Sequence, residues 1–353
     1  MRKLYHKFKV NKIRNWAISL EKGNMEGLKL CPLTREEKEL LIETWGDLGL
    51  KINPLFYQMF KTIEGFNAQY LSDDLFFPLI IKTLNPDNLV GTLEHKGLYT
   101  TLYSELHQPN MLLQRINGVY YNSMMDIVDL VDTIKSAKPD RQYIIKPTVG
   151  SGMGRGVKKV SLNSVDIKDI IHFINNYGDN IVIQEIVEQS SKTSIFNKES
   201  LNTFRVSTLN LNGKASLCTV IFRCGRDGSC VDNAGAGGLV VGVREDGQFY
   251  EYAYDNKYKR YYQSDTGVQF KGTKIEEVKD LIDLAINAHR KYLPTCGFAG
   301  WDFALDVNNK PIFIEVNLGF PGIQLEQLCP AKPIFGERTQ EVIEYVYKHQ
   351  TLI

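Results

Sequence analysis

The sequence predicts a chain of the α+β class, in which a helical N-terminal region precedes a series of antiparallel strands. Three observations support this prediction. Residues 1 to about 90 carry repeated helix start signals. Two later stretches, 202–223 and 300–317, each hold two apolar runs separated by a turn that contains asparagine, which is typical of a β-hairpin. Between these stretches, apolar residues recur at helical spacing over 275–292. After them, a last helix is expected at 337–349.

The N-terminal region is expected to hold three short helices. They are predicted at 34–45 behind a Thr-x-x-Glu capping box, at 54–63 behind Pro54, and at 72–84 behind Ser72. Before them, a segment rich in Lys and Arg is weakly amphipathic around Trp16 and its apolar neighbours. This segment is expected either to dock on the protein as a helix, which is the favoured interpretation, or to lie on a membrane surface.

The hairpin at 300–317 carries oxygen-bearing side chains inside strands that are otherwise apolar. Its turn is predicted at Asn308-Asn309, and because side chains alternate along a strand, Glu315 and Asn317 point to the same face. Pairing about this turn places Asp302 across from them. Carboxylate and amide oxygens suit Mg²⁺, which keeps waters and takes further ligands from substrate phosphates. The alternative interpretation is an edge hairpin whose polar side chains face water.

A second feature is a short apolar strand, 142–147, that ends in Lys146 and runs into a glycine-rich loop at 150–156. Glycines at alternate positions permit positive φ and bring backbone N–H groups close to an anion, so the loop is a candidate phosphate site. It lacks the Gly-Lys-Ser/Thr of a Walker loop, and its lysine precedes the glycines. The residues after Gly156 predict another strand rather than a helix, which excludes a dinucleotide fingerprint.

These elements occur in the order lysine strand, glycine loop, strand, apolar strand at 181–188, and then a distant aspartate and Glu-x-Asn. In that order they resemble the ATP-grasp superfamily over roughly residues 91–335. The runs 201–206, 232–238 and 300–303 resemble its sugar-transfer-associated branch, found beside enzymes of polysaccharide biosynthesis. The resemblance implies that ATP is held between two α+β subdomains. It further implies that a carboxylate is activated as an acyl phosphate and attacked by an amine.

The resemblance also implies roles for individual residues. Lys146 resembles the lysine that contacts the nucleotide phosphates. Lys96, preceded here by His95 instead of an aspartate, resembles the lysine of the family's Asp-Lys entry motif and is also expected to bind the cofactor. The remaining nucleotide residues are expected in the lid over the phosphates (Ser151, Gly152, Gly154, Arg155 and Gly156), in the hinge along the adenine edge (Gln184, Glu185, Ile186 and Val187) and at the ribose (Glu188). The magnesium ligands of the family match Asp302, Glu315 and Asn317 in type, order and separation.

Two arginines lie on the strands joined by the turn at Asn212-Gly213. The family places an arginine like Arg205 near the transferred phosphate and one like Arg223 beside the acyl phosphate. A regular two-residue turn would set them on opposite faces unless a bulge intervenes, so Arg205 is ranked above Arg223. Both are alternatively solvated strand arginines. Substrate contacts are expected from Asn202 and from a glycine-rich loop that holds Asp232, Asn233, Gly237 and Gly238. The alternative interpretation of this loop is an ordinary surface turn.

Composition narrows the class of function. The 353 residues include 42 basic and 41 acidic side chains, giving a net charge of +1, so no global field is expected to recruit nucleic acid or an anionic membrane. No apolar run reaches the length of a membrane span and no signal peptide is evident, so a cytoplasmic location without a transmembrane segment is expected. The six cysteines and six histidines form no zinc or triad pattern, and reduced, packed thiols are expected.

The function predicted is that of an ATP- and Mg²⁺-dependent carboxylate–amine ligase. By analogy with the branch, its substrates are expected to be a sugar acid and an amino acid or other amine, with possible contact to glycan-assembly enzymes. Two alternatives stay open: an ATP-grasp kinase that phosphorylates a hydroxyl, and a non-catalytic nucleotide-bound subunit. The expected organisation is a helical region at 1–90, a pre-ATP-grasp segment at 91–140, a small nucleotide-binding subdomain at 141–190, and a large subdomain at 191–353.

Overall fold

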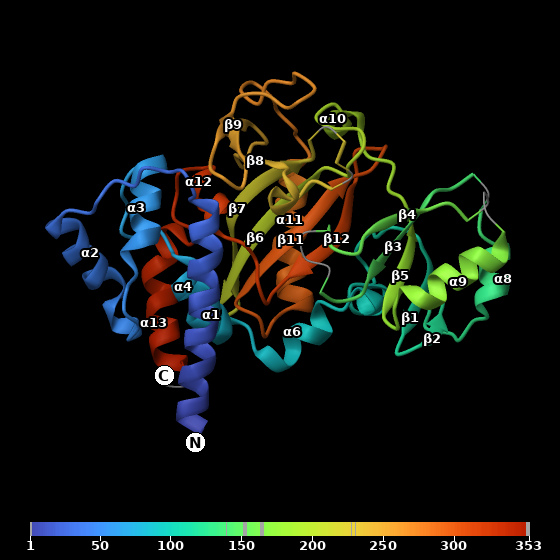
Figure 1. Ribbon diagram of the computed structural model, residues 1–353, viewed down its shortest axis with the longest axis horizontal. Coiled ribbons are helices and arrows are strands. Elements are labelled where there is room, and N and C mark those ends of the chain that lie inside the picture. Colours follow the sequence, from blue (N-terminus) through green and yellow to red (C-terminus); the bar gives the residue numbers. More distant parts are fainter. Residues whose placement is uncertain are drawn as a thin grey trace.

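The computed structural model describes residues 2–138, 140–150, 154–162, 166–226, 228–229 and 231–350. Within them, a group of helices from the N-terminal region, a seven-stranded sheet and a five-stranded sheet lie side by side along the long axis (Figure 1). The predicted mixture of helices and antiparallel strands behind a helical N-terminal region is confirmed. None of the described helices has the length and apolar character needed to cross a lipid bilayer.

The N-terminal region folds as the start signals indicate. Its helices are α1 (Arg2–Asn24), α2 (Arg35–Trp45), η1 (Gly46–Leu48), α3 (Pro54–Ile63), α4 (Asp73–Leu75), η2 (Phe76–Ile80), α5 (Ile81–Leu84) and α6 (Asp87–Leu93). The Thr34 and Glu37 capping box is formed at α2, and Pro54 occupies the first turn of α3. The third predicted helix widens into a π-helical turn at η2, which contains Pro78. Proline has no N–H to donate to the helix ladder, which is a physical reason for this irregularity.

The seven-stranded sheet has the order β10-β9-β8-β7-β6-β11-β12. Its strands are β6 (Thr203–Leu211), β7 (Lys214–Cys224), β8 (Leu239–Val243), β9 (Phe249–Tyr254), β10 (Arg260–Tyr261), β11 (Phe298–Leu305) and β12 (Pro311–Asn317). Both predicted hairpins form. At the first turn, Asn212 and Gly213 both take positive φ (52° and 76°), which matches the right-handed twist of the flanking strands.

The two faces of this sheet differ in chemistry. One face packs Phe204, Phe222, Trp301 and Phe303 into a core with α11 (Val278–Tyr292). The opposite face is polar near the start of β6, where Arg205 lies. Farther along β6 that same face becomes apolar and is covered by the N-terminal helices together with α12 (Gln324–Leu328) and α13 (Thr339–His349). The N-terminal region therefore covers the sheet beside the polar patch.

A β-bulge changes the predicted register of the first hairpin. A regular two-residue turn was expected to set the two arginines on opposite faces unless a bulge intervened. In the structure Arg205 pairs with Ile221 and Thr203 pairs with Arg223, with a register shift between Ser207 and Thr208. The extra residue in the bulge reverses the parity of the strand, so both arginines lie on the polar face.

The five-stranded sheet has the order β2-β1-β5-β3-β4. Its strands are β1 (Met111–Ile116), β2 (Val119–Tyr121), β3 (Tyr143–Pro147), β4 (Lys158–Val160) and β5 (Ile181–Glu185), and α8 (Leu130–Lys135) and α9 (Ile167–Tyr177) pack on one side of it. Because β1 pairs with β5, this sheet draws strands from both sides of the boundary predicted at residue 140. The shorter elements are η3 (Lys96–Leu98), α7 (Tyr99–Leu102), α10 (Ser191–Ser194), η5 (Ala234–Ala236) and η6 (Gly336–Arg338).

Candidate functional site

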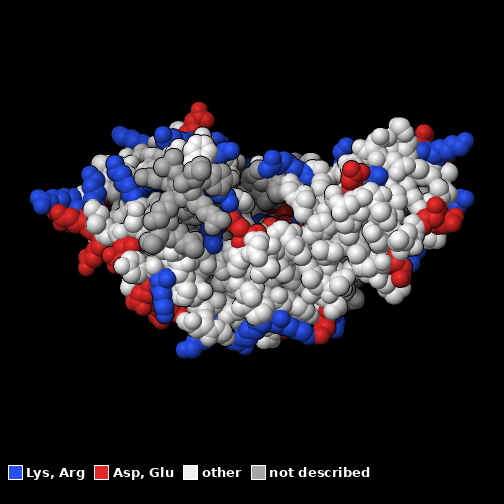
Figure 2. Space-filling view, turned by 90° about the horizontal axis from the view of Figure 1, so that it is seen from below, with Lys and Arg blue, Asp and Glu red and all other residues white. Residues whose placement is uncertain are grey.

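The candidate site lies where the polar faces of the two sheets meet. On the five-stranded sheet, Tyr143 and Ile145 point into the core with α9, so Lys146 and Gln184 point to the other side. Both are largely buried. In the space-filling view a recess lies between the two halves of the molecule, and acidic side chains are visible within it (Figure 2).

Three charged groups from distant parts of the chain meet at this recess. Lys96 Nζ lies 2.8 Å from Glu315 Oε2, and these side chains are only 11% and 28% exposed. Lys146 stands near both. Burial, together with the positive charge of Lys96, lowers the pKa of Lys146 to about 8, although Glu315 opposes the shift. Burial and Lys96 thus oppose a positive charge on Lys146 in the unliganded protein, and a bound anion would favour the charged lysine.

His95 precedes Lys96, at a position where the resemblance led us to expect an aspartate. Its Nε2 atom lies 3.1 Å from Thr148 Oγ1, and the backbone N–H of Lys96 donates to Thr148 O at 3.0 Å. These contacts tie η3 to the residue that follows β3. The histidine therefore helps to fix Lys96 beside Lys146 without supplying a carboxylate.

The glycine-rich loop follows directly from β3. Gly150, Gly154 and Gly156 have φ near +70°, as the loop prediction requires. A Cβ atom on Gly154 would lie 2.8 Å from Val231 Cγ1, so this part of the loop approaches the Asp232 segment. Arg155 is exposed, whereas the predicted lid residues Ser151 and Gly152 lie outside the described residues.

The predicted hinge, 184–187, has little free backbone. The N–H of Glu185 donates to Asn110 O and that of Ile186 donates to Gln142 O, at 2.9 and 2.8 Å. Within the described part of the chain, the N–H of Val187 makes no hydrogen bond, and Gln184 Oε1 is buried without a partner. Glu188 is exposed and pairs with Arg141 at 2.5 Å. The hinge amide left for a ligand is therefore that of Val187.

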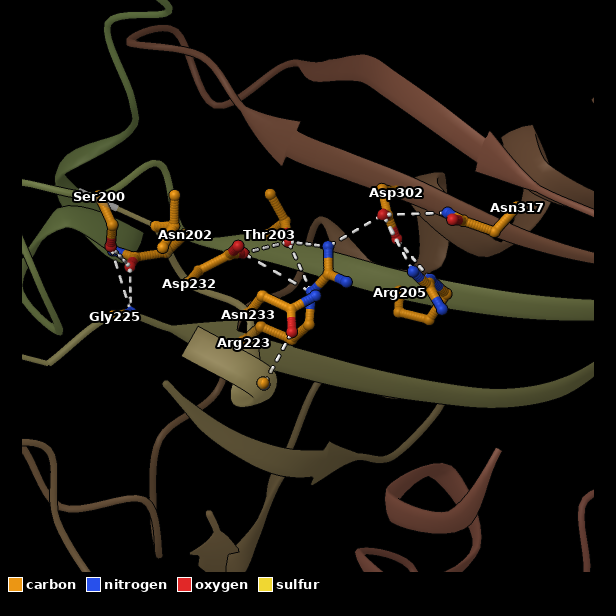
Figure 3. A network of polar contacts seen from close by, with 12 residues as sticks. Ser200, Asn202, Thr203, Arg205, Arg223, Gly225, Asp232, Asn233, Asp302 and Asn317 are labelled. Atoms are coloured by element: carbon orange, nitrogen blue, oxygen red, sulfur yellow. Dashed lines mark hydrogen bonds and ion pairs between the residues drawn. The ribbon is translucent and has the colours of Figure 1, made fainter. Parts of the chain in front are cut away.

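Asp302 is the centre of the polar network on the larger sheet (Figure 3). Arg205 grips it through Nε and through Nη2, the latter 3.0 Å from Oδ2, and Arg223 Nη2 also lies 3.0 Å from Oδ2. Asn317 Nδ2 reaches the same oxygen at 3.3 Å. Burial alone would raise the pKa of Asp302, but the two guanidinium groups lower it far below its ordinary value. The carboxylate is therefore ionised and closely held.

The absence of a side chain at Gly300 leaves room for this network. Gly300 lies on the same face as Asp302, and a Cβ atom there would stand 3.1 Å from Arg205 Cδ. A side chain at position 300 would therefore crowd the arginine against the sheet. The close approach explains why glycine suits a strand position that ordinarily disfavours it.

The Asp232 loop closes one end of the network. Asp232 accepts a hydrogen bond from Thr203 Oγ1 and lies 3.6 Å from Arg223 Nε. Asn233 caps η5 by accepting from the N–H of Gly235 at 2.8 Å. A Cβ atom on Gly238 would stand 2.2 Å from Asp232 O, so only glycine fits there. Gly237, the next residue predicted for the substrate, has φ +96° and is exposed.

Asn202 does not fit the predicted substrate contact. It is completely buried, and its Nδ2 donates to Thr193 O at 2.9 Å and Asn197 O at 2.7 Å. Its Oδ1 accepts from Ser200 Oγ at 2.9 Å. With its hydrogen-bonding groups used by the protein, Asn202 fastens the chain ahead of β6, and we leave it out of the proposed site.

The sequence analysis did not identify three residues that contact the site residues or the backbone beside them. Glu94 Oε1 accepts from the backbone N–H groups of Leu318 and Gly319, directly after Asn317. Asn85 bonds to the backbone at the start of β11 and to Leu318 O. Glu326, on α12, accepts from Thr219 Oγ1 at 2.9 Å and lies 3.4 Å from Arg205 Nη1. No local pattern signals these roles, because each contact joins residues far apart in the sequence.

The donor set at the recess fits magnesium in part. Glu315 is partly exposed, and among the described residues Asn317 makes hydrogen bonds through its Nδ2 and none through its Oδ1. Asp302 is 1% exposed, and both of its oxygens already accept from arginine. The described residues contain no group of three or more His, Cys, Asp or Glu arranged for a metal. A magnesium ion here would rest on Glu315 and Asn317 with phosphate and water ligands, which matches the few protein ligands that Mg²⁺ usually takes.

The described cysteines form no disulfides with one another. Cys31, Cys218, Cys224, Cys296 and Cys329 are all unpaired, and the last three are buried. Burial raises the pKa of the Cys296 thiol to about 11, so it is protonated at neutral pH. This agrees with the expected packed thiols.

Comparisons with known proteins bear on the fold and the family. The solved structures that resemble this chain include the D-cycloserine synthetase DcsG (14% identity, TM-score 0.44, 75% of this chain and 73% of that chain). They also include the D-alanyl-alanine synthetase A of Vibrio cholerae O1 (15%, 0.44, 73% and 65%) and an L-amino acid ligase from Bacillus licheniformis (14%, 0.40, 73% and 48%). At these values the likeness carries no argument, and this chain spans less than two thirds of the latter two proteins.

No curated protein sequence matches this chain. The family model described as sugar-transfer associated ATP-grasp matches residues 79–343, which include both sheets and every residue named above as part of the recess. That match covers well over half of the chain, and it bears out the resemblance found in the sequence. The chain belongs to the sugar-transfer associated ATP-grasp family.

Proposed function

We propose that this protein is an ATP-dependent carboxylate–amine ligase that works through an acyl phosphate. The observation that supports this function is the meeting of two lysines, two arginines and a carboxylate–amide pair at one recess. Phosphoryl transfer depends on positioning and charge neutralisation more than on a covalent group of the protein. This set of side chains supplies both.

The nucleotide is proposed to lie between the two sheets, which would form the two ATP-grasp subdomains. Lys146 and Lys96 would neutralise its phosphates, and the glycine-rich loop would cover them. The free N–H of Val187 would meet the adenine edge. Glu188 is proposed for the ribose, where it would have to leave its exposed pair with Arg141, which costs little.

Glu315 and Asn317 are the proposed magnesium ligands. When bound, the ion would offset negative charge on the β- and γ-phosphates. Asp302 is proposed chiefly to fix the two arginines, because its oxygens already accept from both guanidinium groups. Of the three predicted metal ligands, Glu315 and Asn317 are therefore proposed to bind the ion, and Asp302 is proposed to hold the two arginines.

The proposed chemistry proceeds in two steps. A substrate carboxylate oxygen attacks the γ-phosphorus of ATP, the bond to the β-phosphate oxygen breaks, and ADP leaves with an acyl phosphate formed. An amine then attacks the acyl carbon, loses a proton, and expels inorganic phosphate. Arg223 suits the first product, because its Nη1 makes no hydrogen bond to a described residue and its side chain is held at the recess.

The substrate class rests on analogy with the family. A sugar acid and an amino acid or other small amine are proposed, with the Asp232 loop at the acceptor end of the network. Contact with glycan-assembly enzymes is proposed on the same ground. The Asp232 loop is suited to this place because it borders both Arg223 and the glycine-rich loop.

The test is an ADP-release assay over a panel of sugar acids crossed with amines, repeated with hydroxylamine in place of the amine. A ligase should release ADP only with the correct acid and should then yield a hydroxamate, because hydroxylamine attacks acyl phosphates. A stable phosphorylated sugar hydroxyl as the end product, with no hydroxamate from any acid, would show a kinase and overturn the proposal. Binding of MgATP without turnover on any acceptor would favour the non-catalytic alternative.

A further inference from the structure

The first helix carries charge out of proportion to the rest of the chain. Residues 1–24 contain seven basic side chains and one acidic one, a net charge of +6, whereas the whole chain has +1. The remaining residues therefore carry −5. A basic segment on a weakly acidic body is a common sign of an anionic partner.

One side of α1 is fastened to the protein. Val10, Ala17 and Glu21 are almost fully buried, and Arg14 pairs with the buried Asp74 at 2.8 Å. Val10, Ala17 and Glu21 fall on one side of the helix, since each residue turns it by about 100°. The favoured sequence interpretation, a helix docked on the protein, describes this side.

The other side of α1 is exposed and apolar. Phe8, Trp16 and Leu20 are 68%, 47% and 46% exposed. With Lys9 and Lys12 they fall within an arc of about 120°, on the side of the helix away from the docked residues. Lys9 makes a pair with Asp87 in which both side chains are about half exposed, so it stays available to another partner.

Phe320, an exposed aromatic residue in the loop that follows Asn317, extends this surface. Phe320 is 54% exposed, lies 5.6 Å from the Trp16 ring, and follows Asn317 by three residues. Lys82 Nζ stands 5.0 Å from the Phe320 ring. We call Phe8, Trp16, Leu20 and Phe320, with Lys9, Lys12 and Lys82 around them, the α1 surface.

We propose that the α1 surface binds an anionic lipid membrane and holds the protein flat on it. Aromatic and aliphatic side chains enter the interface between headgroups and acyl chains, and lysines beside them attract anionic headgroups. A second copy of the chain fits less well, because two segments of +6 would repel each other. The bilayer would then lie close to the loop that follows Asn317.

Trp16 provides an internal probe for this contact. The chain has three tryptophans, and the other two, Trp45 and Trp301, are 0% exposed. Added vesicles of phosphatidylcholine with phosphatidylglycerol should shift the emission to the blue and protect it from acrylamide. Vesicles of phosphatidylcholine alone should do neither. Trp16→Phe should abolish the shift while the protein still co-sediments with the anionic vesicles.

Variants separate this surface from general charge. Lys9→Glu with Lys12→Glu should weaken partitioning into anionic vesicles by about tenfold or more, and Phe8→Gln with Leu20→Gln should do the same at low ionic strength. The matched control is Lys168→Glu with Lys271→Glu, two exposed lysines on other elements, which should bind as the wild type does. Circular dichroism checks that each variant is folded. The proposal is overturned if the wild type fails to co-sediment with anionic vesicles, or if the control variant loses binding as strongly as the α1 variant.

Discussion

Lys96 and Glu315 form an ion pair, with Nζ and Oε2 2.8 Å apart, between the start of η3 and the strand β12. The pair neutralises a carboxylate that is proposed to hold magnesium, and it stands beside the buried Lys146. Nucleotide phosphates would give both lysines a stronger partner and leave Glu315 free to bind the ion. The site is therefore expected to exchange this internal pair for contacts with MgATP.

The first prediction concerns Glu315. Glu315→Gln keeps the shape of the side chain but removes the charge, so ATP turnover should fall by about 10²-fold or more at saturating Mg²⁺. Its melting temperature should stay near that of the wild type, because the lost pair is partly exposed. The control is Glu105→Gln, which changes a surface pair with Lys291 and should leave turnover unchanged. Near-wild-type turnover in Glu315→Gln would exclude the carboxylate as a ligand.

The second prediction concerns pH. Burial and Lys96 lower the pKa of Lys146 to about 8, so the unliganded protein loses this proton as the pH rises through that value. Because phosphates favour the charged lysine, affinity for MgATP should weaken by about tenfold for each pH unit above about 8. Titration calorimetry at several pH values measures this, and Lys146→Met should bind weakly with no such step. Lys146→Arg should restore little, since a planar fork does not replace a point charge.

Stability should respond to the same group in the opposite direction. The unfolded chain holds the proton with an ordinary lysine pKa, higher than that of the folded protein, so it binds more protons in the window between them. The stability of the unliganded protein should therefore gain a contribution from Lys146 as the pH rises above about 8. An unchanged pH dependence of the melting temperature in Lys146→Met would contradict the lowered pKa.

Strand periodicity accounts for much of what the sequence predicts correctly. Glu315 and Asn317 share a face and Asp302 pairs with Glu315, as expected for a hairpin about Asn308-Asn309. The shared face needs only local alternation, whereas the pairing of Asp302 with Glu315 also depends on a register shift between Asp302 and Phe303. The capping box at Thr34 is local in the same way.

Other features of the site could not be predicted, because no local sequence pattern signals them. The bulge between Ser207 and Thr208 depends on packing across the sheet, and it decides that Arg205 and Arg223 share a face. Glu326 contacts Arg205 from 121 positions away in the chain. Only the folded chain brings such pairs together, so the burial of Asp302 by two arginines was not predictable either.

The third prediction assigns Glu326 as a positioning residue for Arg205. Glu326→Gln removes the charge that faces Arg205 Nη1, so kcat should fall about tenfold while the KM for ATP changes little. Ser207→Ala is the matched control: it removes a hydroxyl donor to Glu326 but leaves the charge in place, and kcat should stay near the wild type. Equal losses of kcat in both variants would show that Glu326 only supports the fold.

The fourth prediction concerns Asn85, which joins the N-terminal region to the large sheet. Its side chain is 1% exposed, donates to Phe298 O and Leu318 O at 2.7 and 2.8 Å, and accepts from the N–H groups of Gly297 and Phe298. Asn85→Ala removes the partner that these backbone groups share, although the N–H of Gly297 keeps Leu84 O at 2.8 Å, and it should reduce the free energy of unfolding by about 2–4 kcal/mol. Asn308→Ala, at an exposed turn, should cost little. Urea unfolding of both variants measures the difference, and equal midpoints would contradict the bridging role.

The last prediction separates the two arginines. The sequence ranks Arg205 above Arg223, but the structure gives them different attachments on one face. Arg205 holds Asp302 with two nitrogens and also faces Glu326, so Arg205→Ala strips two buried carboxylates of their main positive partner. It should lower both the melting temperature and kcat.

Arg223→Ala leaves Asp302 in the double grip of Arg205, so its folding should be less affected. If Arg223 holds the acyl phosphate, kcat should fall about 10²-fold while the KM for ATP changes little. Hydroxamate yield per ADP released should fall as well, because an acyl phosphate that is held loosely is lost to water. Thermal melts, steady-state kinetics and hydroxamate assays on the two variants distinguish these outcomes. A variant Arg223→Ala that melts early but keeps its kcat would place Arg223 in the fold rather than in the reaction.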